Sequence, residues 1–181
     1  MTTVQRRLLA GAVIIASLYV ATPAASATPP HHPVVAKRAA AIPLDGFVIT
    51  HVPAGVGPLE SEFAYEWEDV TFHSRVWETG PDPEGAYRVD LTVETMRGPS
   101  LRDLEALRTY LTEYLEKDPE AWALRRVKVG WYDGYRDDSR IFWLVSPGVA
   151  ASAVIDRDRF SNTELRRTAR GFVPAHGPVG G

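Results

Sequence analysis

Residues 140–155, RIFWLVSPGVAASAVI, are the stretch of sequence that decides the fold. Two short apolar runs, 140–145 and 149–155, flank the turn residues Ser146-Pro147-Gly148. This arrangement predicts two antiparallel β-strands joined by a short turn. An antiparallel sheet is therefore the starting point for interpreting the rest of the chain.

The segments before this hairpin repeat the strand pattern. A short β-branched run at 46–52 ends at Pro53, and the alternation Phe63, Tyr65, Trp67 predicts a second strand. The turn residues at 80–85, GPDPEG, predict that strands near 69–78 and 86–96 pair as a hairpin. In the latter strand the clearest alternation predicts one core face, formed by Tyr87, Val89, Leu91 and Val93.

Two helices are predicted between and after these strands. Ser100 with Asp103 resembles a capping box before an apolar stripe at three- and four-residue spacing, which predicts a helix over 101–116. Residues 124–131 end in a strand-like alternation, and Asp133-Gly134 is predicted to turn the chain. Ser161 and Glu164 form a second capping box, leading a short helix that ends at Gly171.

The order strands, helix, strands, helix predicts an α+β domain. We expect an antiparallel sheet, with scope for curvature, and two helices packed on one of its faces. Residues 44–173 are predicted to form this single domain, preceded by a disordered Pro/Ala-rich linker at 28–43 and followed by a flexible tail at 174–181.

The first 27 residues predict export. Arg6 and Arg7 precede an apolar run from Leu8 to Val20, and the small residues Ala25-Ser26-Ala27 form a cleavage site. Secretion is the predicted outcome; the alternative is an uncleaved segment, residues 8–21, that tethers the domain outside the membrane. The chain has no Cys, which excludes a cysteine-linked lipid and disulfide bonds.

Charge excludes one class of partner. Without residues 1–27 the chain keeps 18 basic and 23 acidic side chains, a formal charge of about −5. A mildly acidic chain lacks the basic surface that nucleic acid requires. We therefore expect no nucleic-acid partner, and no contact with a membrane beyond residues 8–21.

No motif for catalysis or for a cofactor is present: the nucleophile elbow, the zinc-protease helix and the phosphate-binding glycine loop are all missing. We expect neither a cofactor nor a metal site. Two adjacent histidines (His31, His32), a calcium-loop-like set (Asp156, Asp158, Glu164) and an acidic patch (Asp133, Asp137, Asp138) are each interpreted as solvated side chains. His73 and Ser74 are strand neighbours and should point to opposite faces.

The aromatic residues give the best candidates for binding. Exposed Trp and Tyr side chains on a sheet stack on sugar rings or line apolar grooves, although core packing is the competing use. The candidate binding residues are Tyr65, Trp67, Trp77, Trp131 and Tyr132.

The last third of the chain also resembles a known family. The residues that carry this resemblance are Val127-x-Val129-Gly130, Asp133-Gly134-Tyr135, Phe142-Trp143, Pro147-Gly148-Val149, Ser161-x-x-Glu164-Leu165, Ala169 and Phe172. They are similar to the end of an uncharacterised extracytoplasmic domain attached to Gram-positive anti-sigma factors and envelope lipoproteins. The chain as a whole resembles secreted actinobacterial proteins of unknown function, of the type common in streptomycetes. The resemblance implies a curved-sheet fold.

Two function classes follow. The preferred one is an exported non-catalytic module that binds an envelope component, an apolar ligand or a protein partner through its sheet face. The alternative is a secreted hydrolase with a dispersed site, which requires two or more of His51, His73, Asp69, Glu66 and Glu68 to converge in a cleft.

Overall fold

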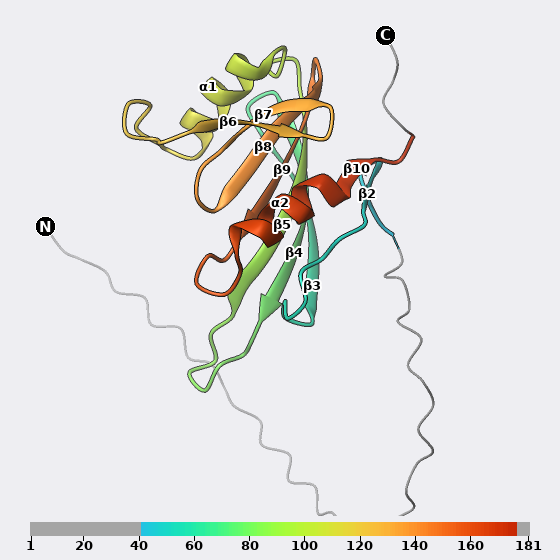
Figure 1. Ribbon diagram of the computed structural model, residues 1–181, viewed down its shortest axis with the longest axis vertical. Helices are drawn as coiled ribbons and strands as arrows, with labels where there is room; N and C mark the ends of the chain where they lie inside the picture. Colours follow the sequence, from blue (N-terminus) through green and yellow to red (C-terminus); the bar gives the residue numbers. More distant parts are fainter. Residues whose placement is uncertain (1–40, 177–181) are drawn as a thin grey trace, which may run out of the picture. The chain divides into compact units, whose positions relative to one another are not determined.

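The computed structural model describes residues 41–176 of the protein (Figure 1). Within this range the chain forms ten strands and two helices, which confirms an α+β fold with an antiparallel sheet. The elements are β1 (Ile42–Leu44), β2 (Phe47–Ile49), β3 (Leu59–Trp67), β4 (Val70–Thr79), β5 (Arg88–Arg97), α1 (Leu104–Tyr114), β6 (Arg125–Val129), β7 (Tyr132–Arg136), β8 (Arg140–Ser146), β9 (Val149–Ile155), α2 (Asn162–Gly171) and β10 (Phe172–Pro174). The predicted signal segment 1–27, most of the linker and the end of the tail lie outside the described residues.

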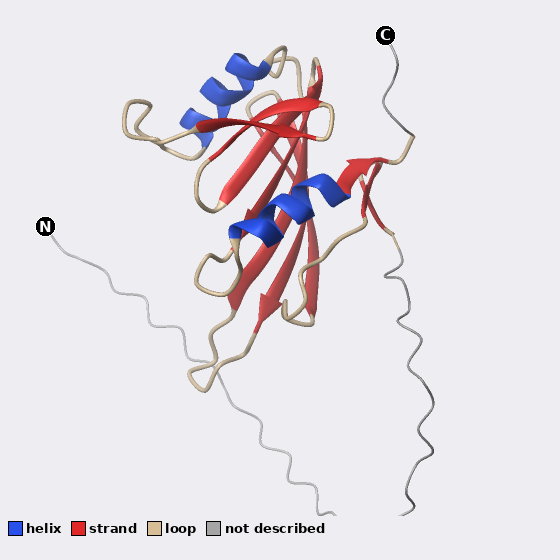
Figure 2. Ribbon diagram, viewed as in Figure 1, coloured by secondary structure: helices blue, strands red, loops and turns tan. Residues whose placement is uncertain are grey.

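Seven strands form the main sheet, in the order β3-β4-β5-β9-β8-β7-β6. Every neighbouring pair is antiparallel, and both predicted hairpins, β4–β5 and β8–β9, are present. Figure 2 shows the strands rotating from upright in β3–β5 to nearly crosswise in β6 and β7, so the sheet is twisted, as sheets generally are. Strands β1, β2 and β10 form a separate three-stranded sheet.

The placement of both helices on one face is wrong, because α1 and α2 pack on opposite faces. Phe142 belongs to the core under α1, whereas its strand neighbours Ile141 and Trp143 belong to the core under α2. Successive residues of a strand point to opposite faces, so the two cores lie on the two sides of β8. The physical reason is that 141–145 is apolar at every position, and such a strand needs cover on both faces.

The predicted common face of Tyr87, Val89, Leu91 and Val93 is also wrong. Trp77 pairs with Leu91 while Glu78 pairs with Val89, so Asp90 is an extra residue in β5. Because of this β-bulge, the residues of β5 that precede Asp90 lie on the opposite side of the sheet from the side predicted by simple alternation. Leu91 and Val93 are buried under α2, whereas Val89 is exposed on the α1 side of the sheet.

Several predicted boundaries move. Asp133 and Gly134 lie inside β7, and the turn is made by Gly130 and Trp131 instead. The N-cap of α1 is Asp103, whose side chain accepts from the Ala106 amide, so this helix begins later than predicted.

The domain is also longer than 44–173 at both ends. Ile42 and Pro43 pair with β2, and the Ala175 amide donates to the Gly46 carbonyl at 2.9 Å. The second capping position is confirmed, because the Ser161 hydroxyl accepts from the Glu164 amide. Neither helix in the described part of the chain has the length and apolar character of a membrane span.

A buried carboxylate holds the loops at the β4–β5 end of the sheet. Asp90 accepts from the Gly57 amide at 2.7 Å and from the Thr79 hydroxyl at 2.6 Å, and it forms an ion pair with Arg159. Arg159 also donates to the Gly55 carbonyl at 2.9 Å. One side chain therefore joins the 50–58 loop, the β4–β5 hairpin and the loop before α2.

These contacts make stability depend on pH. Burial alone raises the pKa of the Asp90 carboxyl group. The hydrogen bonds from Arg159, Thr79 and Gly57 outweigh burial, so that the pKa of Asp90 lies below its ordinary value. A lowered pKa means that the contribution to stability is complete above about pH 4, the ordinary pKa of Asp, and is lost as the pH falls through the folded-state value.

We expect Asp90→Asn to lower the free energy of unfolding by about 2 kcal/mol at neutral pH, because the charge-assisted hydrogen bonds of this fully buried carboxylate are replaced by weaker neutral ones. The variant should also show a smaller loss of stability on acidification than the parent chain. Urea unfolding at several pH values measures both effects. Asp158→Asn, in the loop before α2 and exposed to solvent, is the control. Equal acid sensitivity of Asp90→Asn and the parent chain would contradict this role.

Candidate binding face

The α1 side of the main sheet changes in character from one end to the other. Cross-strand neighbours form rows across β3, β4, β5, β9 and β8. The first row lies under α1 and is Tyr65, Phe72, Met96, Ala150 and Leu144. The second is Phe63, Ser74, Glu94, Ser152 and Phe142, and the third is Ser61, Val76, Thr92, Val154 and Arg140.

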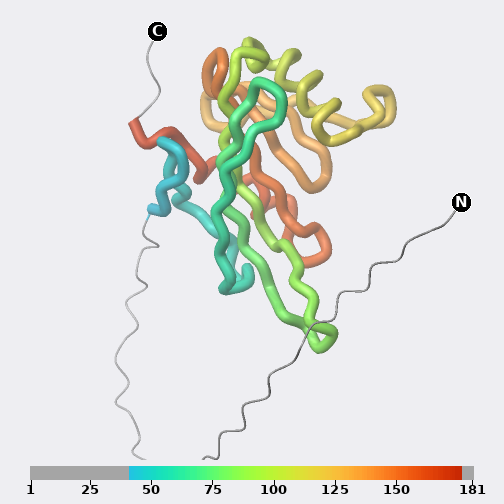
Figure 3. The backbone as a smooth tube through the Cα atoms, turned by 180° about the vertical axis from the view of Figure 1, so that it is seen from behind, coloured from blue at the N-terminus to red at the C-terminus, as the bar shows by residue number. Residues whose placement is uncertain are grey.

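Helix α1 covers the first of these rows but not the third. Figure 3 shows α1 at the end of β3–β5 that lies away from the β4–β5 turn. Beyond the second row the side chains are half-buried or exposed. We call this surface, together with Phe63 at the outer end of the second row, the open face; it comprises Leu59, Ser61, Phe63, Val76, Glu78, Val89, Thr92, Arg140 and Val154.

Large apolar side chains are concentrated here. Leu59, Phe63 and Val89 are 38%, 52% and 47% exposed. Tyr65, in the adjoining row, and Tyr87, two residues before Val89, are also exposed. These five are most of the exposed large apolar side chains in residues 41–176, and the others are Trp131 and Val173. Isolated exposed apolar residues are ordinary, but a group on one face indicates a contact surface.

An ion pair with little exposure to solvent joins the open face to the second row. Glu94 Oε1 accepts from Arg140 Nη1 at 2.8 Å and from the Ser152 hydroxyl at 2.7 Å. The Glu94 side chain is 6% exposed and that of Arg140 is 16% exposed. The ion pair compensates the charge of Glu94, whose neighbours on this surface are apolar or small residues. It also fixes the position of the Arg140 side chain.

Tyr65 connects the open face to α1. Its hydroxyl lies 2.7 Å from the Tyr114 hydroxyl, and its ring stacks on Phe72. Burial raises the pKa of Tyr65 above its ordinary value, helped by the hydrogen bond to Tyr114 and by the negative charge of Glu94. The phenol is therefore protonated at physiological pH and acts as a hydrogen-bonding group, not as a base.

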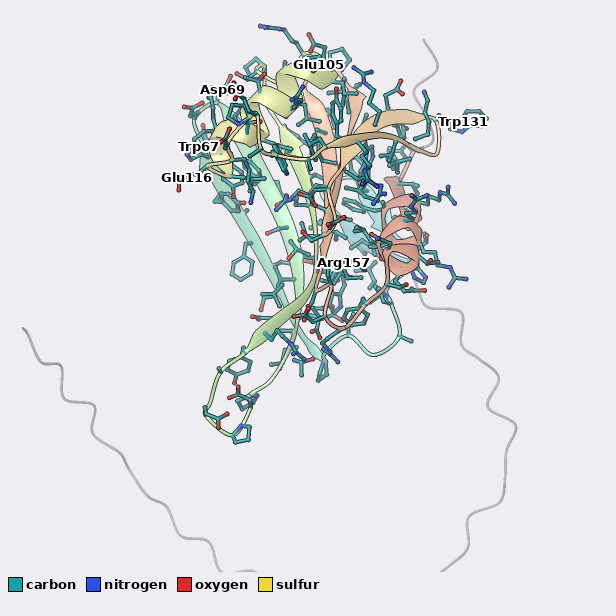
Figure 4. All side chains as sticks on the ribbon, turned by 60° about the vertical axis from the view of Figure 1, so that its left-hand side comes forward. Trp67, Asp69, Glu105, Glu116, Trp131 and Arg157 are labelled. Carbon is teal, nitrogen blue, oxygen red and sulfur yellow. The ribbon has the colours of Figure 1, made fainter. Side chains whose placement is uncertain are left out.

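The five candidate aromatic residues do not form one site. Trp77 is buried in the core under α2, so it is a packing residue. Trp67 packs edge-on against Tyr110 beneath α1. Figure 4 shows Trp67 beside α1 and Trp131 at the tip of the β6–β7 hairpin, well separated on the domain. Tyr132 follows Trp131 and is half-buried. Of the five, only Tyr65 borders the open face.

The residues required for a dispersed hydrolase site are divided between places: His51 lies beside α2, whereas Glu66, Glu68 and Asp69 lie around the β3–β4 turn. His51 Nε2 lies 2.7 Å from Glu164 Oε2, beside α2, whereas the Asp69 carboxylate accepts from the Ser100 hydroxyl at 2.6 Å. His73 pairs with Thr95 in the middle of the sheet. Glu66 and Glu68 are exposed near the β3–β4 turn.

The contact between His51 and Glu164 is a link between the segment after β2 and α2. The hydrogen bond from His51 lowers the pKa of Glu164 below its ordinary value, against the effect of burial. The Thr50 hydroxyl donates to the Gly171 carbonyl at 2.9 Å on the same segment. These bonds explain the positions of the two side chains by packing alone.

In the part of the chain that is described, the acidic side chains considered as possible metal ligands form ion pairs and hydrogen bonds within the fold. Asp133 forms an ion pair with Lys128 at 2.8 Å, and Asp137 accepts from the Trp122 indole at 2.9 Å. Asp156 accepts from the Asp158 amide at 2.9 Å, as in a turn. Within residues 41–176 no group of three His, Asp or Glu side chains could hold a metal ion. His31 and His32 lie outside this range.

The residues that sequence reasoning missed are those of the open face. The alternation of Phe63, Tyr65 and Trp67 predicts a strand but not the exposure of Leu59 at its start, and the sequence pattern predicts that Val89 faces the core. The β-bulge at Asp90 removes Val89 from the core, and no local sequence pattern predicts which strand of a hairpin takes the extra residue.

Comparison with protein-family models, curated proteins and solved structures finds no match to this chain.

The ion pair of Glu94 and Arg140 gives a testable energetic pattern. We expect Glu94→Leu and Arg140→Met each to destabilise the domain by about 3 kcal/mol, because each leaves one buried charge unpaired. The double variant Glu94→Leu/Arg140→Met should recover most of this loss, since it removes both charges and keeps the volume. Urea unfolding of the four proteins measures the coupling. Strict additivity of the two single changes would show that the pair is not coupled.

Proposed function

We propose that this chain is an exported, non-catalytic module that binds a protein partner through its open face. The observation that supports this proposal is the group of exposed apolar side chains, Leu59, Phe63 and Val89, on the part of the sheet that α1 leaves uncovered. A surface of this kind loses apolar contact with water when a partner covers it, which is favourable by about 25 cal/mol per Å².

The two sides of the edge strand β3 support the choice of this face. On the opposite side of the same strand, Glu60 and Glu62 form ion pairs with Arg75. That side is charged and hydrated, so β3 has a clear apolar side. In residues 41–176 no helix packs over the outer end of that apolar side, at Leu59 and Phe63.

A protein partner fits the open face better than a small ligand does. Small ligands are held in concave sites that bury most of their surface. The apolar side chains of the open face instead stand on a sheet, exposed by a third to a half. A second protein can cover such an area with its own apolar core and polar rim.

Export is the second part of the proposal, and it is supported by the sequence of residues 1–27. We expect the secreted protein to begin at Thr28, because signal peptidase cleaves after small residues at the positions of Ala25 and Ala27. N-terminal sequencing of protein from the culture medium measures this directly. Replacing Ala27 with Leu should leave the precursor uncleaved. A membrane-bound protein that keeps Met1 would favour the tethered alternative.

The partner can be sought by site-specific photo-cross-linking in the producing organism. With p-benzoylphenylalanine at position 63 or 89, we expect the same discrete adduct, because both positions lie on the open face. The matched control is position 66, on the other side of β3. A Phe63→Lys change in the position-89 protein should abolish the adduct and change the free energy of unfolding by less than about 0.5 kcal/mol. Equal labelling from all three positions, or none from 63 and 89, would contradict the proposal.

A further inference from the structure

A second surface, on the other edge of the sheet, has a different chemistry. A hollow of about 310 Å³ lies between β6 and α2. Its lining residues are Arg126, Val127, Lys128, Val129, Ile141, Arg166, Ala169 and Arg170. Half of these residues are basic and none is acidic. Ile141 and Ala169 are buried and form an apolar floor, and Arg166 and Arg170 stand exposed on α2.

The position of the hollow matters because β6 is an edge strand. It pairs with β7 on one side and with no strand of the described chain on the other. The backbone N–H and C=O groups of alternate residues along such an edge are free to pair with another strand. Four consecutive residues of β6, from Arg126 to Val129, line the hollow, so the hollow follows this free edge.

Basic side chains lie on both faces beside this edge. Arg166 and Arg170 are on the α2 side. On the α1 side, Arg126 forms an ion pair with Glu105 at 2.6 Å and Lys128 forms one with Asp133 at 2.8 Å. A strand added to β6 would point its alternate side chains to these two faces in turn. Arg166 and Arg170, which make no ion pair within residues 41–176, would attract acidic side chains most strongly.

The hollow continues at one end into an apolar one. A second hollow of about 280 Å³ shares Val129 and Arg170 with the first. It is lined by Trp131, Tyr132, Phe172, Val173 and Pro174. Figure 4 shows Trp131 at the tip of the β6–β7 hairpin, which stands beyond α2. The Trp131 side chain is 85% exposed, which is unusual for a Trp without a partner.

We propose that this edge is a binding site for an extended acidic peptide segment, which adds to β6 as a further strand between β6 and α2. Its backbone pairs with the free edge of β6, its acidic side chains face Arg166 and Arg170, and an apolar side chain at its end packs against Trp131. Main-chain bonds supply affinity in this mode of recognition, and the flanking side chains supply specificity. This surface is separate from the open face, so the two sites can act independently.

A peptide explains the surface better than a free polyanion does. A polyanion would use the charges of Arg166 and Arg170 but not the free backbone groups of β6. The second copy of this chain is the other occupant to consider, because β3 is itself an acidic edge strand with Glu60, Glu62 and Glu66. The experiment below separates these three occupants.

The probe is a fluorescent peptide of alternating Glu and Val that ends in Trp, and binding is followed by anisotropy at low salt. We expect saturable binding that weakens roughly tenfold for Arg166→Ala/Arg170→Ala, since two exposed ion pairs are lost. The same peptide with N-methyl groups on alternate amides keeps its charge, but its methylated amides cannot donate hydrogen bonds to the backbone of β6. Its binding should also weaken roughly tenfold or more. Trp131→Ala should weaken binding of the Trp-ended peptide but not of a peptide that ends in Gly.

The control variant is Arg102→Ala/Arg167→Ala, which removes the same charge from exposed positions that do not line the hollow. It should bind the peptide as the parent chain does. Equal binding of the N-methylated peptide would assign the surface to polyanions and overturn strand addition. Self-association that is abolished by Glu60→Lys/Glu62→Lys would assign the edge to a second copy and also overturn the proposal. Absence of saturable binding to the unmodified peptide would overturn it outright.

Discussion

Burial of β8 and β9 on both faces is the constraint on which the rest of the structure depends. Trp143 and Phe142 are adjacent in β8, both are fully buried, and they belong to different cores. Each core needs its own helix, so α1 and α2 cannot share a face. The small residues opposite them in β9, Ala151 and Ser152, leave room for the two large aromatic side chains. A single hairpin thereby determines that the sheet lies between two helices.

This arrangement also explains why one surface stays open. Two helices of 11 and 10 residues cover only part of a seven-stranded sheet, whose strands reach 10 residues. On the α2 side the three-stranded sheet adds cover, since Phe47 and Ile49 belong to the core there. On the α1 side the described chain has no additional sheet of this kind. The surface there changes from the apolar row under α1 to the ion pair of Glu94 and Arg140, and then to the exposed side chains of Phe63 and Leu59. Residues 41–176 therefore leave the open face uncovered, and packing among these residues does not explain its apolar character.

Local signals in the sequence predicted the elements but not their relative placement. The Ser146-Pro147-Gly148 turn, the 80–85 turn and the Ser161 cap are short-range features, and each appears as predicted. Placement of α1 and α2 on opposite faces depends on contacts between residues far apart in sequence, and the one local signal for it is the unbroken apolar run after Arg140, which the prediction of a single covered face does not use. The β-bulge at Asp90 could not be predicted, because it is stabilised by Gly57, Thr79 and Arg159 from three other segments. Since that bulge exposes Val89, the candidate face was beyond local sequence reasoning as well.

The two edges of the main sheet carry opposite charge, and this restricts what each can pair with. Edge strand β3 has Glu60, Glu62 and Glu66 on one side, whereas β6 is flanked by Arg126, Lys128 and the arginines of α2. Two copies joined through β3 and β3, or through β6 and β6, would bring like charges together, which is unfavourable for cross-strand neighbours. Pairing of β3 with β6 is electrostatically permitted, but it is head-to-tail and would build a ring or an open chain of molecules instead of a symmetric dimer. Arg126 and Lys128 already have intramolecular partners, Glu105 and Asp133, which weakens their attraction for the carboxylates of β3. Among residues 41–176, Arg166, Arg170 and the outer edge of the β6 backbone have no partner, and they are better suited to one short acidic strand than to another folded domain.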